Sequence, residues 1–210
     1  MICLDKSYFE TLSKVPRLNL INSCMGYKSA NLIGTVSKDG VTNLAVFSSI
    51  THLGSDPALL GFILRPTTVP RHTYSNLRES GYFSVNAISE SFIRSAHQTS
   101  ANYPKEVSEF EATGITVEWK QGVAVPFVDQ SPVQLLCKYL NEYTIHENGT
   151  LHVIASIEKI YVNESMLSDD YWIQLDKGGV VSINGLDGYA KTELLERLPY
   201  ARANKDKSAF

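Results

Sequence analysis

The spacing of hydrophobic residues is helical only near the N-terminus and becomes β-like over most of the chain. An apolar stripe predicts a short helix over residues 5–14, stopped by Pro16. Residues 17–22 alternate between apolar and polar side chains, which predicts an extended segment. Further β-rich runs predict strands at 31–38, 42–51, 58–64, 82–88, 115–120, 123–128, 133–145 and 150–162, with weaker candidates at 171–175 and 180–183.

Turn signals separate these runs. Asp39-Gly40 lies between two β-rich runs and predicts a hairpin with a type I′ turn, which needs a positive φ at both central residues. Residues 146–149 predict a second hairpin. Many strands and few helices favour an antiparallel barrel or sandwich in one domain spanning residues 1–210. The predicted helices lie at 73–80, closed by Gly81, at about 91–96, capped by Ser89 or Ser91, and at 191–198, stopped by Pro199.

Composition restricts the possible functions. Hydrophobic residues make up 43% of the chain and charged residues 20%, as expected for a globular protein with a sizeable core. The net charge of -3 predicts no nucleic-acid polymer as a partner. The longest apolar run, residues 58–64, is too short to cross a bilayer, and residues 1–6 carry no secretory signal. Three widely spaced cysteines fit no zinc site. We therefore expect a cytoplasmic protein with no membrane partner and no metal.

One candidate binding segment is the strand that ends in two serines. Side chains alternate along a strand, so Asn43 and Ala45 share one face and Leu44 lies on the other. The small Ala45 would let a ring approach the backbone. Ser48 and Ser49 would offer hydroxyl and N–H groups to a flat polar ligand. The same residues also fit an ordinary strand that ends in capping serines.

A second candidate is the loop at residues 65–73, just before a predicted helix. The first turn of a helix carries free N–H groups and a partial positive charge, which suit a phosphate. Arg71 would add a charge-assisted contact and Thr73 a hydroxyl. The alternative is a solvated loop in which a threonine caps the helix.

A third candidate is the polar segment that contains His97 and Ser100. His97 is a candidate general acid or phosphate partner, although a histidine at a helix end also fits a bond to the last carbonyls. Glu109 and Glu111 fit a solvated face better than a catalytic carboxylate pair. No glycine-rich nucleotide-binding motif and no hydrolase elbow occur, so no catalytic residue is assigned.

Several short motifs, taken in order, make the chain resemble a known family over about residues 25–200. They are Asn31-Leu32-Ile33-Gly34-Thr35, Asp39-Gly40, Asn43-Leu44-Ala45 with Ser48-Ser49, Asp56-Pro57, Arg71-His72-Thr73 with Asn76 and Gly81, Val85-Asn86, Ala96-His97-Gln98-Thr99-Ser100, Ser108-Glu109-Phe110 with Gly114, Gly185-Leu186-Asp187-Gly188-Tyr189 and Leu198-Pro199-Tyr200-Ala201. In this order the chain resembles the flavin reductase-like proteins, whose fold is the FMN-binding split barrel.

The resemblance implies a mainly β fold, namely a six-stranded antiparallel Greek-key split barrel with a few short flanking helices. It also implies an extended C-terminal arm at about residues 185–210 and a homodimer with FMN near the subunit interface. By the resemblance, one set of residues lines the flavin, a second holds its phosphate and a third lies near the same site. These sets are Asn43, Leu44, Ala45, Ser48 and Ser49, then Arg71 and Thr73, and finally Lys28, Ser29, His97 and Ser100.

The activity implied is that of an FMN-dependent oxidoreductase, which passes hydride from NAD(P)H to the flavin and on to an acceptor. The partners are then flavin and nicotinamide nucleotides. Two positions depart from the family: Thr150-Leu151 follows Gly149 where some relatives have Asp-His, and Leu136 stands where relatives often have Glu. These departures keep open an FMN-binding electron carrier without its own nicotinamide site. A barrel that binds another small apolar ligand is a third hypothesis.

Overall fold

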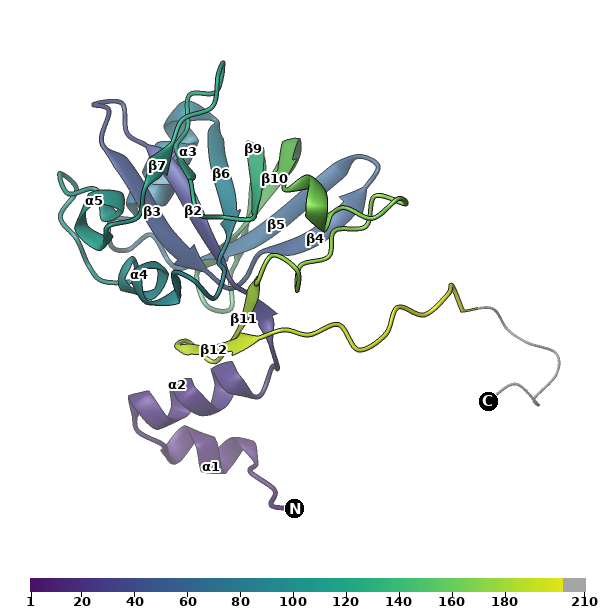
Figure 1. The fold of residues 1–210 in the computed structure, drawn as a ribbon. Helices are drawn as coiled ribbons and strands as arrows, with labels where there is room; N and C mark the ends of the chain where they lie inside the picture. Colours follow the sequence, from purple (N-terminus) through teal and green to yellow (C-terminus); the bar gives the residue numbers. More distant parts are fainter. Residues whose placement is uncertain (202–210) are drawn as a thin grey trace.

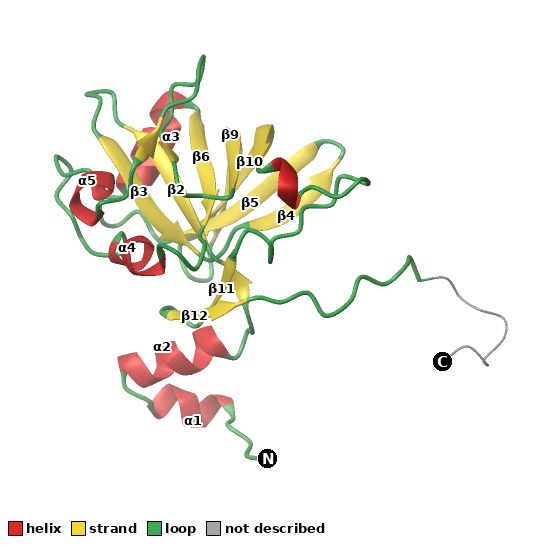
Figure 2. Ribbon diagram, viewed as in Figure 1, coloured by secondary structure: helices red, strands yellow, loops and turns green. Residues whose placement is uncertain are grey.

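A curved antiparallel sheet of seven strands forms the centre of the computed structural model, which describes residues 1–201 (Figures 1 and 2). Its strand order is β3-β2-β6-β9-β10-β5-β4, so neighbours in the sheet are often distant in the sequence. The strands are β2 (Asn31–Val36), β3 (Thr42–Phe47), β4 (Thr51–Ser55), β5 (Ala58–Leu64), β6 (Tyr82–Ala87), β9 (Val133–Ile145) and β10 (Thr150–Val162).

Two smaller sheets and several short helices surround this sheet. One small sheet has the order β1-β11-β12, and the other pairs β7 with β8. The short strands are β1 (Lys28–Ser29), β7 (Val117–Glu118), β8 (Phe127–Val128), β11 (Val181–Asn184) and β12 (Gly188–Lys191). The helices are α1 (Lys6–Thr11), α2 (Lys14–Ser23), α3 (His72–Ser80), α4 (Ile93–Gln98), α5 (Glu109–Thr113) and a 3₁₀ turn at Glu164–Met166. The predicted fold class is confirmed, although the main sheet has seven strands rather than six.

The main sheet has apolar clusters on both faces. Leu32 and Ile33 are both fully buried, yet they belong to different clusters, because consecutive side chains of a strand point to opposite faces. Leu77 of α3 packs in the cluster of Ile33, whereas α4 and α5 contribute Ala96 and Phe110 to the cluster of Leu32. The β3 end of the sheet therefore lies between α3 on one face and the α4–α5 pair on the other (Figure 1).

Both predicted hairpins form. β9 and β10 pair over their whole length with the predicted bounds and are joined at residues 146–149. The turn between β2 and β3 differs from the predicted type I′ turn, because only Gly40 has a positive φ there, 83°. Its N–H donates to the Ser37 carbonyl at 3.0 Å, and the Ser37 N–H donates to the Val41 carbonyl at 2.9 Å. This arrangement is a tight turn closed by a left-handed glycine.

Three predicted segments have a different structure. Residues 17–22 are helical. Pro16 does not stop this helix, because it is the third residue of α2, where a missing N–H removes no helical bond. Residues 171–175 form no strand apart from one bridge at Ile173. Residues 192–201 have no regular structure in place of the predicted helix at 191–198. The charged tail from residue 202 lies outside the described residues.

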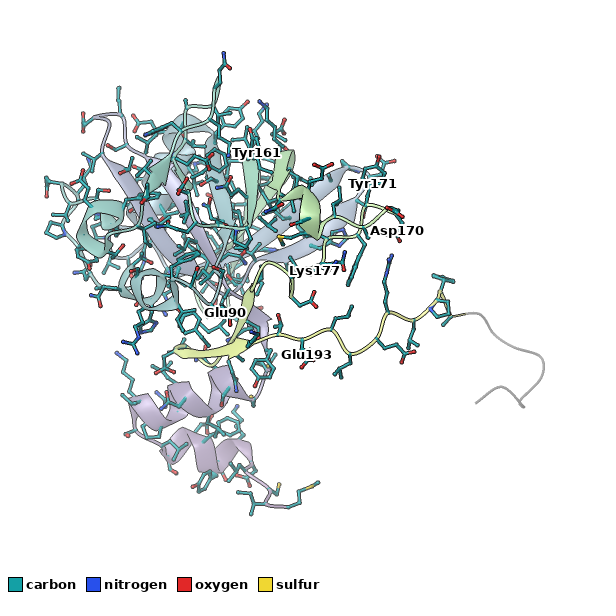
Figure 3. The ribbon with its side chains drawn as sticks, in the orientation of Figure 1. Glu90, Tyr161, Asp170, Tyr171, Lys177 and Glu193 are labelled. Carbon is teal, nitrogen blue, oxygen red and sulfur yellow. The ribbon has the colours of Figure 1, made fainter. Side chains whose placement is uncertain are left out.

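The C-terminal segment at residues 192–201 leaves β12 and runs along the loop that follows the 3₁₀ turn (Figures 1 and 3). Arg197 Nη2 lies 2.5 Å from Asp170 Oδ2, and its guanidinium lies 4.8 Å from the centre of the Trp172 ring. Arg197 therefore anchors this segment, while Leu195 remains 94% exposed. In the described part of the chain, every helix is too short or too polar to cross a membrane.

Candidate functional site

Two residues predicted from separate motifs meet at the β3 end of the sheet. Asn43 on β3 donates from Nδ2 to Thr73 Oγ1 in the first turn of α3, at 3.0 Å. Both residues are buried, at 7% and 4% exposure. A buried amide requires such a partner, since leaving it unpaired costs about 1–3 kcal/mol. This bond fixes the serine-ended strand against the start of the helix.

The start of α3 carries the arginine of the predicted phosphate loop. Arg71 is the N-cap residue, and its extended backbone (φ -129°) leads directly into the helix. Its Nε donates to the Pro66 carbonyl at 3.4 Å, which holds the preceding loop against the helix start. The alternative interpretation, in which a threonine caps the helix, is wrong, because Arg71 is the N-cap and Thr73 is the second residue of the helix. Helix α3 ends at Gly81, whose φ of 74° is readily adopted by glycine.

The two serines after β3 differ in their roles. The Ser49 hydroxyl accepts from the Ile63 N–H at 3.0 Å and donates to the Ile63 carbonyl at 3.2 Å. Its side chain therefore joins the end of β3 to β5 and is already engaged. Ser48 is half-buried and lies directly beyond the end of β3. Of the pair, Ser48 is the better candidate for a side-chain contact with a ligand.

Leu44 and Ala45 occupy opposite faces of β3. The Leu44 side chain is fully buried in the cluster below α4 and α5, so it lines no open surface. Ala45 is half-buried and pairs with Ile33 on the α3 side of the strand. The Leu44 backbone is also engaged, because its N–H donates to Glu109 Oε2 at 2.9 Å.

The predicted pair Lys28-Ser29 is divided between two places. The Ser29 hydroxyl donates to the Ile50 carbonyl at 2.9 Å, beside the serine end of β3. Lys28 Nζ donates instead to the Asn22 and Gly185 carbonyls, at 3.3 and 3.0 Å. Ser29 is therefore brought to the β3 site, whereas Lys28 joins α2 to the turn between β11 and β12.

His97 and Ser100 lie on the α4 side of the sheet, not with Thr73. His97 Nδ1 lies 3.3 Å from the Tyr189 hydroxyl, and the two rings meet edge to face at 5.7 Å. Burial, with a smaller contribution from Asp187, raises the pKa of Tyr189 to about 12. The exposed Ser100 donates its N–H to the His97 carbonyl at 3.0 Å. The structure thus joins His97 to β12 rather than to the helix start that carries Arg71.

Sequence reasoning missed the role of Glu109. The predicted solvated face is wrong for Glu109, which is only 6% exposed and bonds to β3, whereas Glu111 is exposed. Burial raises the pKa of the Glu109 carboxyl above its usual range, and the bond from Leu44 opposes that rise. The adjacent Ser108 Oγ lies 2.6 Å from Thr42 Oγ1. The signal was Phe110, an apolar residue whose burial directs the start of α5 toward the sheet.

A separate polar cavity of about 510 Å³ lies beside β7, β9 and β10, lined among others by Tyr161 and Lys177 (Figure 3). In it, Lys120 Nζ lies 2.7 Å from Glu118 Oε1 and 4.4 Å from the centre of the Tyr161 ring. Gln134 Nε2 donates to Glu118 Oε2 at 2.8 Å. These polar groups therefore form hydrogen bonds with one another. None of the predicted site residues lines this cavity.

Comparisons with known proteins identify the family to which the chain belongs. The family model described as "Flavin reductase like domain" matches residues 25–179. An uncharacterised protein of Halalkalibacterium halodurans is 30% identical over 67% of this chain and 68% of its own length. A crystal structure from Shewanella frigidimarina NCIMB 400, provisionally assigned as a flavin reductase with a split barrel domain, is 41% identical. It covers 96% of this chain and 100% of its own, with a TM-score of 0.92.

A flavoredoxin of Desulfovibrio vulgaris shares the fold at 23% identity, with a TM-score of 0.70, over 83% of this chain and 91% of its own. The family match spans more than half of the chain, including β3, α3 and α5. The chain therefore belongs to the family of proteins with a flavin reductase like domain.

Proposed function

We propose that the protein is an FMN-dependent oxidoreductase of the flavin reductase type, with FMN held between β3 and the start of α3. The observation that carries this proposal is the bond from Asn43 to Thr73, which fixes the two candidate segments against each other. Family membership and the flavoredoxin fold relative support a flavin as the ligand.

The start of α3 is suited to the phosphate of FMN. The helix has nine residues, so its first N–H groups present a partial positive charge to an anion. Arg71 at its N-cap would add a charge-assisted contact. Its Nε is held by Pro66, which leaves the terminal nitrogens of the guanidinium to reach a phosphate. This donor set fits a phosphate monoester.

The outer edge of β3 is suited to the polar edge of a flavin ring. β3 is the terminal strand of its sheet, so alternate backbone groups face away from β2. The Leu44 N–H faces outward, because it bonds to Glu109, and the unbroken register makes Val46 face the same way. Ser48 lies directly beyond the end of the strand. Because the Leu44 N–H is already engaged, we assign the ring to the end of this edge, beginning at Val46.

The chain's residues would bind and orient the cofactor rather than transfer protons. When bound, FMN supplies the redox chemistry, accepting hydride from NAD(P)H and passing electrons to an acceptor. Outward N–H groups on β3 would stabilise negative charge on the reduced ring. Hydride transfer requires no ionising side chain, which agrees with the absence of an assigned acid or base.

We also propose a homodimer. On the outer face of the sheet, His152 of β10 pairs with Ile63 of β5 on one side and with Tyr143 of β9 on the other. Tyr143 is 60% exposed. Helices α1 and α2 have no buried residue, so their apolar side chains are at most partly covered within residues 1–201. A second copy would bury both surfaces. The unpaired cysteines of the described chain agree with a cytoplasmic location, and we treat the chain as one domain.

A visible absorption spectrum of the purified protein tests the proposal. We expect flavin absorption near its characteristic bands, or its appearance with added FMN, and bleaching under anaerobic NADH or NADPH. A yellow protein that only dithionite reduces supports the electron carrier instead. A colourless protein that does not bind added FMN overturns the proposal and leaves the apolar-ligand barrel. Light scattering on the same sample tests the homodimer.

A further inference from the structure

We propose that Glu109 is a positioning residue that sets where the flavin ring lies along the edge of β3. The inference rests on the proposed function and assigns a residue to its site. Glu109 Oε2 accepts the Leu44 N–H at 2.9 Å. It therefore occupies a backbone donor that a ligand on this edge would otherwise use.

Three consecutive residues of β3 are tied to the starts of two helices. Thr42 Oγ1 lies 2.6 Å from Ser108 Oγ, Asn43 bonds to Thr73, and Leu44 bonds to Glu109. Helix α5 thus holds the strand on one side and α3 on the other. The three contacts fix the position of β3, along its own axis, relative to the start of α3, where the phosphate is proposed to bind.

The accessible edge of β3 begins immediately after this clamp. Outward N–H groups recur at every second residue, so the next one after Leu44 belongs to Val46. Among residues 1–201, no hydrogen bond outside the sheet engages the Val46 N–H. Glu109 therefore leaves Val46 as the first outward backbone position for a ring, with Ser48 just beyond the end of the strand. It excludes a ring bound one step further back, at Leu44.

The hydrogen bond, and not the charge, is the part of Glu109 that this role requires. The carboxyl is 6% exposed, so its ionised form loses most of its hydration. A glutamine has the same length and can accept the Leu44 N–H through its amide oxygen. A methionine has similar volume but only a weak acceptor. Glu109→Met therefore removes the hydrogen bond while largely keeping the packing of the side chain.

The experiment measures FMN and riboflavin dissociation constants for the full chain by quenching of flavin fluorescence. We expect Glu109→Met to weaken both ligands by the same factor, about tenfold, through the loss of one hydrogen bond that positions the strand. Glu109→Gln is expected to restore both to within about threefold of the unaltered protein. Glu111→Gln, an exposed carboxylate on the same helix, is the matched control and should change neither. Amide hydrogen exchange at Leu44 should accelerate in Glu109→Met and recover in Glu109→Gln.

Each other outcome is decisive. If Glu109→Met binds both ligands like the unaltered protein, or weakens FMN alone, Glu109 does not position the ring and the inference is wrong. If Glu109→Met does not fold, Glu109→Asp, whose shorter side chain withdraws the carboxylate from the Leu44 N–H, must weaken both ligands by one common factor, and an unchanged affinity then overturns the inference. If the unaltered protein binds neither flavin, the proposed function fails, which is a different result from a Glu109 variant that binds normally.

Discussion

Asn43 on β3 donates its side-chain amide to Thr73 Oγ1 at the start of α3, at 3.0 Å, across 30 positions of sequence. The bond connects a strand edge to a helix start, two features that are each common in proteins. Together they place outward backbone donors and an N-cap arginine on neighbouring elements. The candidate site depends on this connection more than on either motif alone.

Replacing Thr73 by valine tests this connection. The variant keeps the size and branching of the side chain but leaves Asn43 Nδ2 buried without its acceptor. We expect the free energy of unfolding to fall by about 1–3 kcal/mol, measured by urea denaturation. Thr73→Ser keeps the hydroxyl and should lose less. Equal stability of Thr73→Val and the unaltered protein would contradict the role given to this bond.

The proposed phosphate contact predicts a difference between two ligands. Arg71→Ala should weaken FMN by at least about tenfold, because a charge-assisted bond contributes about 1.5–3 kcal/mol. Riboflavin lacks the phosphate, so its affinity should not change. Titration of the protein with each flavin provides both values.

Arg65→Ala is the matched control for this prediction, because Arg65 is exposed in the same loop and precedes Pro66. It should leave both affinities within about twofold of the unaltered protein, as expected for a solvated charge. An equal loss of FMN and riboflavin affinity in Arg71→Ala would mean that Arg71 supports the loop rather than the phosphate.

The close approach of β2 to the segment before β8 predicts a large effect of one methyl group. A Cβ at Gly34 would lie 2.6 Å from the Pro126 carbonyl oxygen and 2.5 Å from Ser84 Oγ. Gly34→Ala should therefore lower the free energy of unfolding by about 1–3 kcal/mol, as overpacking does in well-packed cores. At Gly54 the nearest atom to a Cβ would be the Pro57 carbonyl oxygen at 3.2 Å, so Gly54→Ala should cost less. Thermal unfolding of both variants measures the difference.

The long hairpin of β9 and β10 could be predicted from the sequence alone. Continuous β-rich runs flank a turn that ends in Gly149, whose φ of 69° suits glycine. The residues of the turn and of the two flanking runs are therefore sufficient to predict that β9 pairs with β10. The same holds for α3, where Gly81 ends the helix in the left-handed conformation.

Segments whose structure depends on tertiary surroundings were predicted less well. Residues 17–22 have both an alternating pattern and a helical one, and Pro16 is compatible with the first turn of a helix. Residues 192–201 are anchored by Arg197 to Asp170 and Trp172 rather than by helical bonds. The position of Glu109 also escaped prediction, because a short polar helix carries no signal for which strand edge it meets.

The cysteines predict a simple pattern of reactivity. Cys3 and Cys24 are exposed, whereas Cys137 is fully buried on β9. Burial raises the pKa of the Cys137 thiol well above its usual range, so little reactive thiolate forms. An Ellman titration of native protein should modify two thiols rapidly and the third only in denaturant. Rapid modification of all three would show that β9 opens in the native state.

The buried carboxyl of Glu109 predicts a pH-dependent difference between two proteins. Burial raises the pKa of this group above its ordinary value of 4.5, so the folded protein holds the proton to a higher pH than the unfolded chain. The associated stability is therefore present below pH 4.5 and is lost as the pH rises through the folded pKa. Glu109→Gln does not titrate, so its free energy of unfolding should increase relative to the unaltered protein between pH 4 and pH 7. Denaturation curves of both proteins across this range measure the difference in the free energy of unfolding. The contributions of the other carboxylates are common to both proteins and cancel in this difference. A difference that does not change with pH would mean that Glu109 has an ordinary pKa and that solvent reaches its carboxyl group beside Leu44.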